Sequence, residues 1–110
     1  MLKKLLLSTV AIAFVATIQP AEAAESRVLK RIKERGVVNM GHRESSVPFA
    51  YIGKDGKPIG YSMDICNMYV DKIRKVLKMP NIKVKHVPVT SQTRIALMAN
   101  GTIDMECGST

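Results

Sequence analysis

The chain has 110 residues and a formal net charge of +8, with 5% aromatic residues, two cysteines and two histidines. This length allows one small domain with a single core, and the cysteines and histidines lack the close spacing of a zinc site. Most basic residues lie along predicted amphipathic helices without aromatic residues between them, which indicates solvated helix faces and argues against a nucleic-acid-binding protein.

Residues 1–23 have the three parts of a secretory signal peptide. Lys3 and Lys4 form a positive start, residues 5–18 are mostly apolar, and Ala21-Glu22-Ala23 is a small-residue cleavage sequence. The apolar run is shorter than the roughly 20 residues that a membrane anchor needs. We therefore predict cleavage after about Ala23, export without a stable membrane anchor, and a net charge of +7 once two lysines and Glu22 are removed.

Two cysteines, Cys66 and Cys107, remain after this cleavage. An exported chain enters an oxidising compartment, in which thiols can pair. Export and the even count together predict a Cys66–Cys107 disulfide, although sequence spacing does not place the two Cα atoms within reach of each other.

A short helix and a strand come first. Residues 26–35 place apolar side chains on one helical face, and Gly36 is a natural helix end. The apolar residues 37–41 predict a strand, and the polar residues 43–48 predict a loop that ends in a proline.

A hairpin and the longest helix come next. Asp55-Gly56 between the short apolar runs 49–52 and 58–61 predicts the hairpin. Residues 63–79 predict a helix that Ser62 or Asp64 caps. Its expected apolar face consists of Ile65, Met68, Tyr69, Ile73, Val76 and Leu77.

The last part of the chain alternates between strand and helix. Residues 82–87 predict a strand whose even positions face one way, and residues 103–107 predict another. Between them, a helix capped by Thr90 or Ser91 runs to about Asn100. Strands separated by single helices predict an α/β fold, with a parallel sheet, flanking helices and one hairpin. Two long helices and a short one cover such a sheet poorly, so the fold looks incomplete.

A polar loop follows each predicted parallel strand. Ligands in open α/β sheets bind beyond the carboxyl ends of the strands, so we expect these loops to form one site. Two of the loops contain an arginine that could grip a carboxylate with paired hydrogen bonds. The second loop also opens a helix, whose free N–H groups favour an anion. The candidates in the first two loops are Arg43, Thr90, Ser91 and Arg94, and Ser109 lies in the third.

Each candidate also has a plainer interpretation. Thr90 or Ser91 could be only a helix cap, Arg94 a solvated charge, and Ser109 a turn residue. His42 is better explained as a packed strand-end residue than as a base. The chain has no serine-nucleophile elbow, metal-spaced histidine pair or phosphate-binding loop, so we expect no catalytic residue, metal or cofactor.

Four segments, taken in order, resemble one family. Residues 41–49 (GHRESSVPF), 60–64 (GYSMD), 88–94 (PVTSQTR) and 100–110 (NGTIDMECGST) are similar to the glutamate/aspartate-binding members of solute-binding protein family 3. These proteins are periplasmic receptors of polar amino-acid ABC transporters. The likeness runs from about Leu29 to the end of the chain.

The resemblance implies both a fold and ligand contacts. Residues 24–110 are expected to be the N-terminal portion of the first lobe of a type II periplasmic-binding-protein fold. By position, Arg94 is expected to clamp the ligand α-carboxylate beside Ser91. Ser109 is expected to hold the ligand's backbone groups, and Arg43 to meet the side-chain carboxylate. The expected partner is an inner-membrane ABC transporter permease, and we expect a monomer.

Family members close two lobes over the ligand, and the chain ends at the loop after the third strand. We therefore expect the second lobe and the hinge to be absent, and binding by this chain alone to be weak or lost. The alternatives on the same fold are a sensor module or a cyclohexadienyl-dehydratase-like enzyme, for which only His42 and Glu44 could serve as acid or base.

Overall fold

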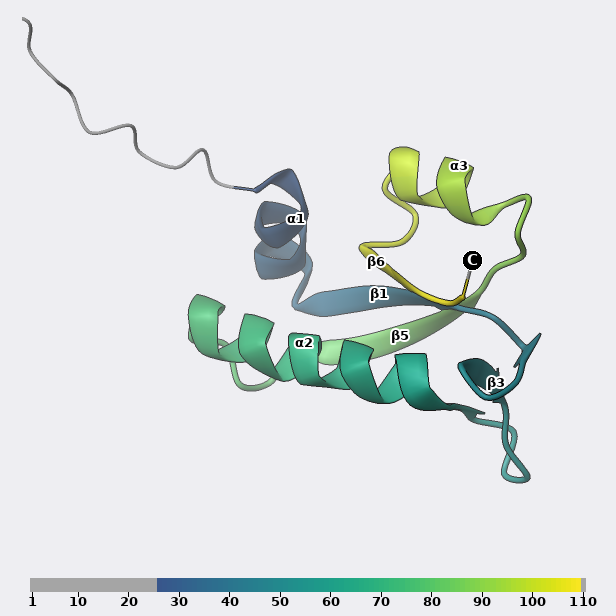
Figure 1. The fold of residues 1–110 in the computed structure, drawn as a ribbon. Coiled ribbons are helices and arrows are strands. Elements are labelled where there is room, and N and C mark those ends of the chain that lie inside the picture. The colour runs from purple at the N-terminus through teal and green to yellow at the C-terminus, as the bar shows by residue number, and fades with distance from the viewer. Residues whose placement is uncertain (1–25, 110) are drawn as a thin grey trace, which may run out of the picture.

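A computed structural model describes residues 26–109 (Figure 1). The predicted signal peptide lies outside these residues. Within them, no helix has both the length and the apolar character needed to cross a bilayer. The elements in chain order are α1 (Arg27–Arg35), β1 (Val37–His42), β2 (Ser45–Ser46), β3 (Ala50–Ile52), β4 (Pro58–Ile59), α2 (Tyr61–Leu77), β5 (Lys83–Pro88), α3 (Arg94–Ala99) and β6 (Met105–Cys107).

A three-stranded parallel sheet in the order β5-β1-β6 forms the centre of the fold. β1 pairs with β5 along its whole length and with β6 over its last three residues. Figure 1 shows α2 and α3 on opposite sides of this sheet. The predicted α/β fold with a parallel sheet is therefore confirmed, and the carboxyl ends of all three strands lie at one edge.

A second, antiparallel sheet in the order β2-β3-β4 contains the predicted hairpin. β3 and β4 pair through Tyr51 with Ile59 and Ile52 with Pro58, around a turn in which Gly56 has a φ of 76°. The segment 43–48, predicted to be a loop, contains the short strand β2, which pairs with β3. Two residues are too few to show strand periodicity, so the sequence did not reveal this pairing.

The capping of α2 differs from the prediction. Gly60 stands at the N-cap, and neither Ser62 nor Asp64 makes a side-chain cap. The N–H groups of Tyr61 and Ser62 instead donate to the backbone carbonyls of Pro48 and Phe49, at 3.0 and 2.8 Å. Gly60 has a φ of 127°, and a Cβ there would overlap the Phe49 carbonyl. Backbone acceptors from the hairpin therefore satisfy the helix start, and no side-chain cap is needed.

The apolar face predicted for α2 is wrong in part. The buried residues are Met63, Cys66 and Val70, and Ile73 and Leu77 pack beside them. These five positions follow the i, i+3, i+4 spacing of one helical face. The other four predicted residues are exposed, at 38% for Ile65, 71% for Met68, 60% for Tyr69 and 58% for Val76. The helix has apolar residues on two adjoining faces, and the sequence did not show which one meets the sheet.

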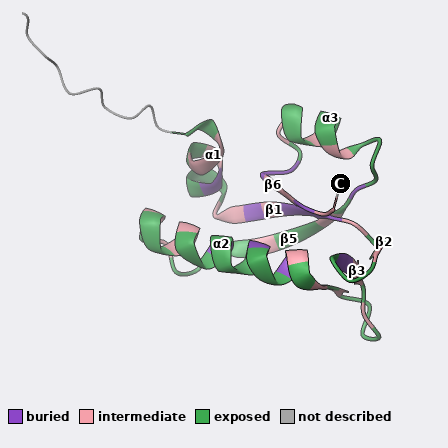
Figure 2. Cartoon of the chain, viewed as in Figure 1, coloured by how far each residue is buried: buried purple, intermediate pink, exposed green. Residues whose placement is uncertain are grey.

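A disulfide joins α2 to β6. Cys66 and Cys107 are bonded, with their Cα atoms 6.2 Å apart, so the predicted pairing is confirmed. Both are among the buried residues of the core, which also contains Ile32, Val38, Met40, Ala50, Met63, Val70 and Ile82. Figure 2 shows this burial along β1 and on the side of α2 that faces the sheet.

Asp104, just before β6, fastens α1 to the sheet. Its side chain is 1% exposed, and both of its oxygens accept from Arg35 Nη2 at 2.8 Å. The backbone N–H of Asn39 donates to the same carboxylate at 2.8 Å, and Arg31 Nη2 lies 3.4 Å away. Gly36 ends α1 as predicted, with a φ of 68° and its N–H donating to the Ile32 carbonyl.

Candidate ligand-binding site

The three predicted loops meet at one edge of the parallel sheet. His42, the last residue of β1, stands opposite both Pro88 of β5 and Cys107 of β6. The loops that begin at Arg43, Val89 and Gly108 are therefore neighbours. A ligand site in an open α/β sheet occupies this position.

Arg94 is turned toward the third loop. It is the first residue of α3, and its side chain is 21% exposed. Its Nη1 donates to the backbone carbonyl of Ser109 at 3.4 Å and lies 3.6 Å from Glu106 Oε2. Its Nε is buried and makes no hydrogen bond within the described part of the chain. Arg94 is thus not a freely solvated helix charge.

Arg43 reaches the same place from the first loop. Its side chain is half-buried, and a Cβ added to Gly108 would lie 3.0 Å from Arg43 Cγ. The same Cβ would overlap the Glu106 carboxylate. Gly108 is therefore the point where the Arg43 stem and the Glu106 carboxylate come together, and any larger residue there would displace one of them.

Ser91 is less closely tied to the site. It is exposed, and no hydrogen bond between residues 26 and 109 joins it to Arg43, Arg94 or Ser109. Neither Thr90 nor Ser91 caps α3, whose N-cap is Thr93 without a side-chain cap. In the turn before the helix, the Thr90 hydroxyl accepts from the Thr93 N–H at 3.2 Å. The Thr93 hydroxyl in turn accepts from the Thr90 N–H at 3.0 Å.

The helix expected to begin in this loop is shorter than predicted, because the threonine turn precedes it and α3 has six residues. So short a helix has a small dipole. The affinity of this edge for an anion therefore rests on the arginine side chains.

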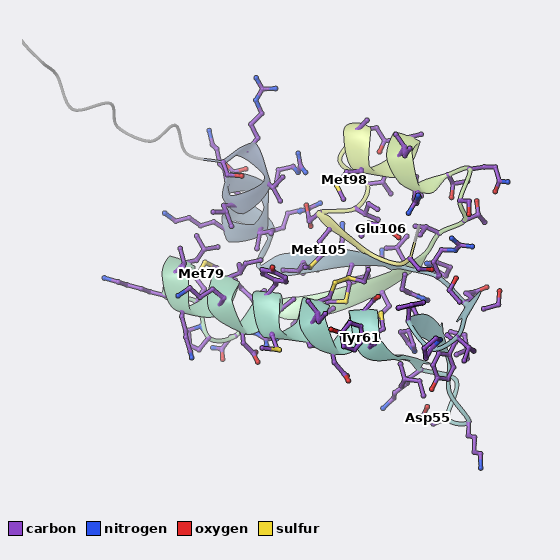
Figure 3. The ribbon with its side chains drawn as sticks, in the orientation of Figure 1. Asp55, Tyr61, Met79, Met98, Met105 and Glu106 are labelled. Carbon is purple, nitrogen blue, oxygen red and sulfur yellow. A yellow bond between two sulfur atoms is a disulfide. The ribbon has the colours of Figure 1, made fainter. Side chains whose placement is uncertain are left out.

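Glu106 was not among the predicted site residues. Met105 packs on the core side and Cys107 bonds to α2, so Glu106 between them faces α3 (Figure 3). There it borders an open hollow of about 370 Å³ between α3 and β6, together with Arg94, Ile95, Met98 and Ala99. The available signal was alternation: a glutamate between two core-facing residues of a strand points to the opposite face.

His42 is packed at the strand end, as expected. It is 3% exposed, and its Nδ1 lies 3.2 Å from the Arg43 carbonyl oxygen. Its ring meets the His86 ring edge-on, with centroids 5.9 Å apart. Partial desolvation, and to a lesser extent the neighbouring His42, lowers the pKa of His86 below its usual 6.5, although the side chain remains exposed.

This shift predicts a small loss of stability in mild acid, because water screens the charge on the exposed His86 side chain. Because the folded-state pKa of His86 is depressed, its contribution is present above pH 6.5 and is lost as the pH falls through the lower folded value. Thermal melts between about pH 7.5 and pH 5.5 should show a falling midpoint. The substitution His86→Gln should reduce this slope, and an unchanged slope would rule out His86 as its source.

No metal centre is evident at this edge. Among residues 26–109, no three histidine, cysteine, aspartate or glutamate side chains gather closely enough to hold a metal ion. The groups placed at this edge are the Arg94 guanidinium, the Glu106 carboxylate, the stem of Arg43, and the backbone and hydroxyl groups of the third loop. Such a set can bind a small molecule that carries carboxylates.

Comparison with known proteins agrees with this chemistry. The family model for bacterial extracellular solute-binding proteins, family 3, matches residues 38–110. An L-glutamate/L-aspartate-binding protein of Pseudomonas aeruginosa is 47% identical over 106 residues, which cover 96% of this chain and 35% of that protein. A glutamate/aspartate import solute-binding protein of Escherichia coli K12 is 47% identical over 96 residues, which cover 87% of this chain and 32% of that protein.

Solved structures show the same fold. An ancestral cationic amino-acid solute-binding protein matches with a TM-score of 0.63 and 23% identity, over 74% of this chain and 33% of that one. An ancestral cyclohexadienyl dehydratase matches with a TM-score of 0.58 and 29% identity, over 77% of this chain and 32% of that one. The chain therefore spans about a third of the proteins that it matches.

Proposed function

The chain belongs to family 3 of the bacterial extracellular solute-binding proteins, and from this premise we propose that it binds an acidic amino acid, L-glutamate or L-aspartate, for delivery to an ABC transporter. The observation that carries the proposal is that both arginines reach the third loop, Arg43 with its stem beside Gly108 and Arg94 with its guanidinium beside the Ser109 carbonyl. Two guanidinium groups suit a ligand with two carboxylates. The names of the relatives with 47% identity support this ligand class.

We assign the contacts by position in the three loops. Arg94 binds the α-carboxylate, because its guanidinium is held beside the Ser109 carbonyl at the centre of the edge. Arg43 binds the side-chain carboxylate from the first loop. Ser109 holds the ligand's backbone groups, and Ser91 supplies a hydroxyl next to Arg94. Parallel N–H···O bonds from an arginine give a carboxylate both orientation and affinity.

We further propose that residues 1–23 are a cleaved signal peptide and that residues 24–110 are the N-terminal portion of the first lobe. The family description, which names extracellular proteins, supports export, and the periplasm is the compartment in which an ABC transporter permease would receive the ligand. The share of the relatives that this chain spans supports the lobe assignment. Binding by this portion is expected to be weak, since a lobe that closes over the ligand adds contacts and excludes water.

A binding protein is favoured over an enzyme. The dehydratase-like alternative would need an acid or base in the site, and the two candidates are poorly placed. His42 is buried against the sheet, and Glu44 is exposed. Turnover of prephenate-like substrates by the purified chain would overturn this part of the proposal.

The test of the function is a nuclear magnetic resonance titration of the chain, produced with its own N-terminal segment and purified from the periplasmic fraction. If the chain instead stays in the cytoplasm with residues 1–23 still attached, the export assignment is contradicted. We expect L-glutamate to shift the signals of residues around Arg43, Arg94 and Ser109, with an affinity weaker than micromolar. Micromolar binding would show that this portion needs no second lobe.

Arg94→Ala should abolish these shifts, because it leaves the α-carboxylate without its charged donor. Losing one partner of such a pair weakens binding by roughly 30-fold or more. The control is Arg27→Ala, which removes the same charge from the exposed start of α1 and should leave binding intact. Wild-type affinity in Arg94→Ala would remove Arg94 from the site.

A further inference from the structure

Glu106 is a negative charge that lies beside the Arg94 guanidinium and near the stem of Arg43. Its Oε2 lies 3.6 Å from Arg94 Nη1, and its side chain is 19% exposed. Its carboxylate also lies against Gly108, at the spot that the Arg43 stem contacts from the other side. Figure 3 shows Glu106 in the region between β6 and α3, together with Met98. The carboxylate is thus the negative charge next to Arg94, at the loop that the Arg43 stem also reaches.

The contacts of Glu106 differ from those of a structural carboxylate. Asp104, two residues earlier, is saturated by Arg35 and the Asn39 N–H at 2.8 Å. Glu106 has one long ion pair, and its buried Oε1 makes no hydrogen bond within residues 26–109. Such an arrangement does little to fasten elements together. Its main physical effect is on the electrostatic potential of the site, where partial burial reduces screening by water.

We propose that Glu106 is a selectivity residue that sets the net charge of the site to one positive unit. Arg43 and Arg94 contribute two positive charges, and Glu106 offsets one of them. Glu44, the other acidic residue near this edge, is exposed, so solvent screens its charge. An acidic amino acid has two carboxylates and one ammonium group, which makes its net charge −1. A dicarboxylate of the same length without the amino group, such as glutarate, has a net charge of −2.

The consequence is discrimination in favour of the amino acid. Without Glu106 the site would have two uncompensated positive charges, and the dianion would gain more from them than the monoanion. This inference rests on the proposed function, since it concerns the choice of ligand at the same site. The substitution Glu106→Gln keeps the side-chain shape and removes the charge, with an amide group in place of one carboxylate oxygen.

The experiment compares L-glutamate with glutarate in paired titrations of the wild-type chain and Glu106→Gln, followed on the Arg94 side-chain N–H signal. We expect the ratio of glutarate affinity to L-glutamate affinity to rise about tenfold in the variant, for one unit charge at a partly screened site. Glu106→Asp, which retains the charge, should keep a ratio close to that of the wild type. Glu34→Gln removes an equal charge from an exposed position on α1 and should change neither affinity.

The outcomes separate the selectivity role from the proposed function. If the wild type binds L-glutamate and the ratio is unchanged in Glu106→Gln, the selectivity role is overturned and the proposed function stands. If the wild type fails to bind L-glutamate, the proposed function is overturned, and the glutarate comparison decides the role of Glu106. In that case, tighter binding of glutarate by Glu106→Gln than by the wild type supports the role. Equal glutarate binding by the two proteins, or no glutarate binding by either, overturns it.

Discussion

Replacement of both disulfide cysteines, Cys66→Ala with Cys107→Ala, is expected to lower the free energy of unfolding by about 4 kcal/mol, the value that chain entropy predicts for a loop of this length. The bond closes a segment with a sequence separation of 41 residues. It also anchors β6, which pairs with β1 through three residues. The whole stability of a domain this small is about 5–10 kcal/mol, so the variant should unfold readily at moderate temperature.

Urea unfolding of the wild type with and without a reducing agent measures this effect. The reduced wild type should approach the double variant, and the double variant itself should be insensitive to reduction. Thiol titration of the denatured wild type should find no free thiol before reduction, since both cysteines are paired. Two reactive thiols in the unreduced wild type, or an unfolding midpoint that is the same with and without the reducing agent, would contradict the disulfide.

Asp104→Asn is expected to cost about 2–3 kcal/mol, toward the lower end for breaking a buried ion pair. Asp104 is 1% exposed and holds both Arg31 and Arg35 at the junction of α1 with the sheet. An amide would keep the shape but lose the charge, and it would turn a donor toward one of these arginines. The side chains of the two arginines are 36% and 38% exposed, so their outer ends can turn to water, which limits the loss.

Asp71→Asn is the matched control for this prediction. Asp71 pairs with Arg74 at 2.8 Å, yet its side chain is 66% exposed, and an exposed pair of this kind contributes under about 1 kcal/mol. Thermal or urea unfolding of the two variants separates the effect of burial from that of charge removal. Equal losses of unfolding free energy in the two variants would show that the buried Asp104 ion pairs stabilise the junction of α1 with the sheet no more than an exposed pair does.

The prediction of the elements succeeded where local chemistry decides the structure. Gly36 ends α1, Asp55-Gly56 turns the hairpin, and Asn100 ends α3, because each of these depends on a few adjacent residues. The prediction failed for the N-cap and the buried face of α2. The first N–H groups of that helix donate to the carbonyls of Pro48 and Phe49. These acceptors lie more than ten residues earlier in the chain, so a local sequence pattern does not predict them.

The same division holds for the candidate site. The parallel order of the strands was enough to predict that the loops of Arg43, Arg94 and Ser109 lie at one edge, because the carboxyl ends of parallel strands converge. It did not predict Glu106, since a glutamate inside a strand gives no local sign of what faces it. The neighbour of Glu106 is Arg94, from the helix that connects β5 to β6.

The sequence by itself determined the α/β order and which loops lie at the candidate edge, because these follow from spacing and residue type along the chain. It predicted the disulfide only from export and the even count, and the fold brought the two Cα atoms within reach. Only the tertiary structure decided which face of α2 is buried, how Asp104 holds α1, and that the Glu106 carboxylate lies beside Arg94. The physical reason is that burial and ion pairing depend on groups that are distant in sequence, such as Arg35 and Asp104, and become neighbours only when the sheet forms.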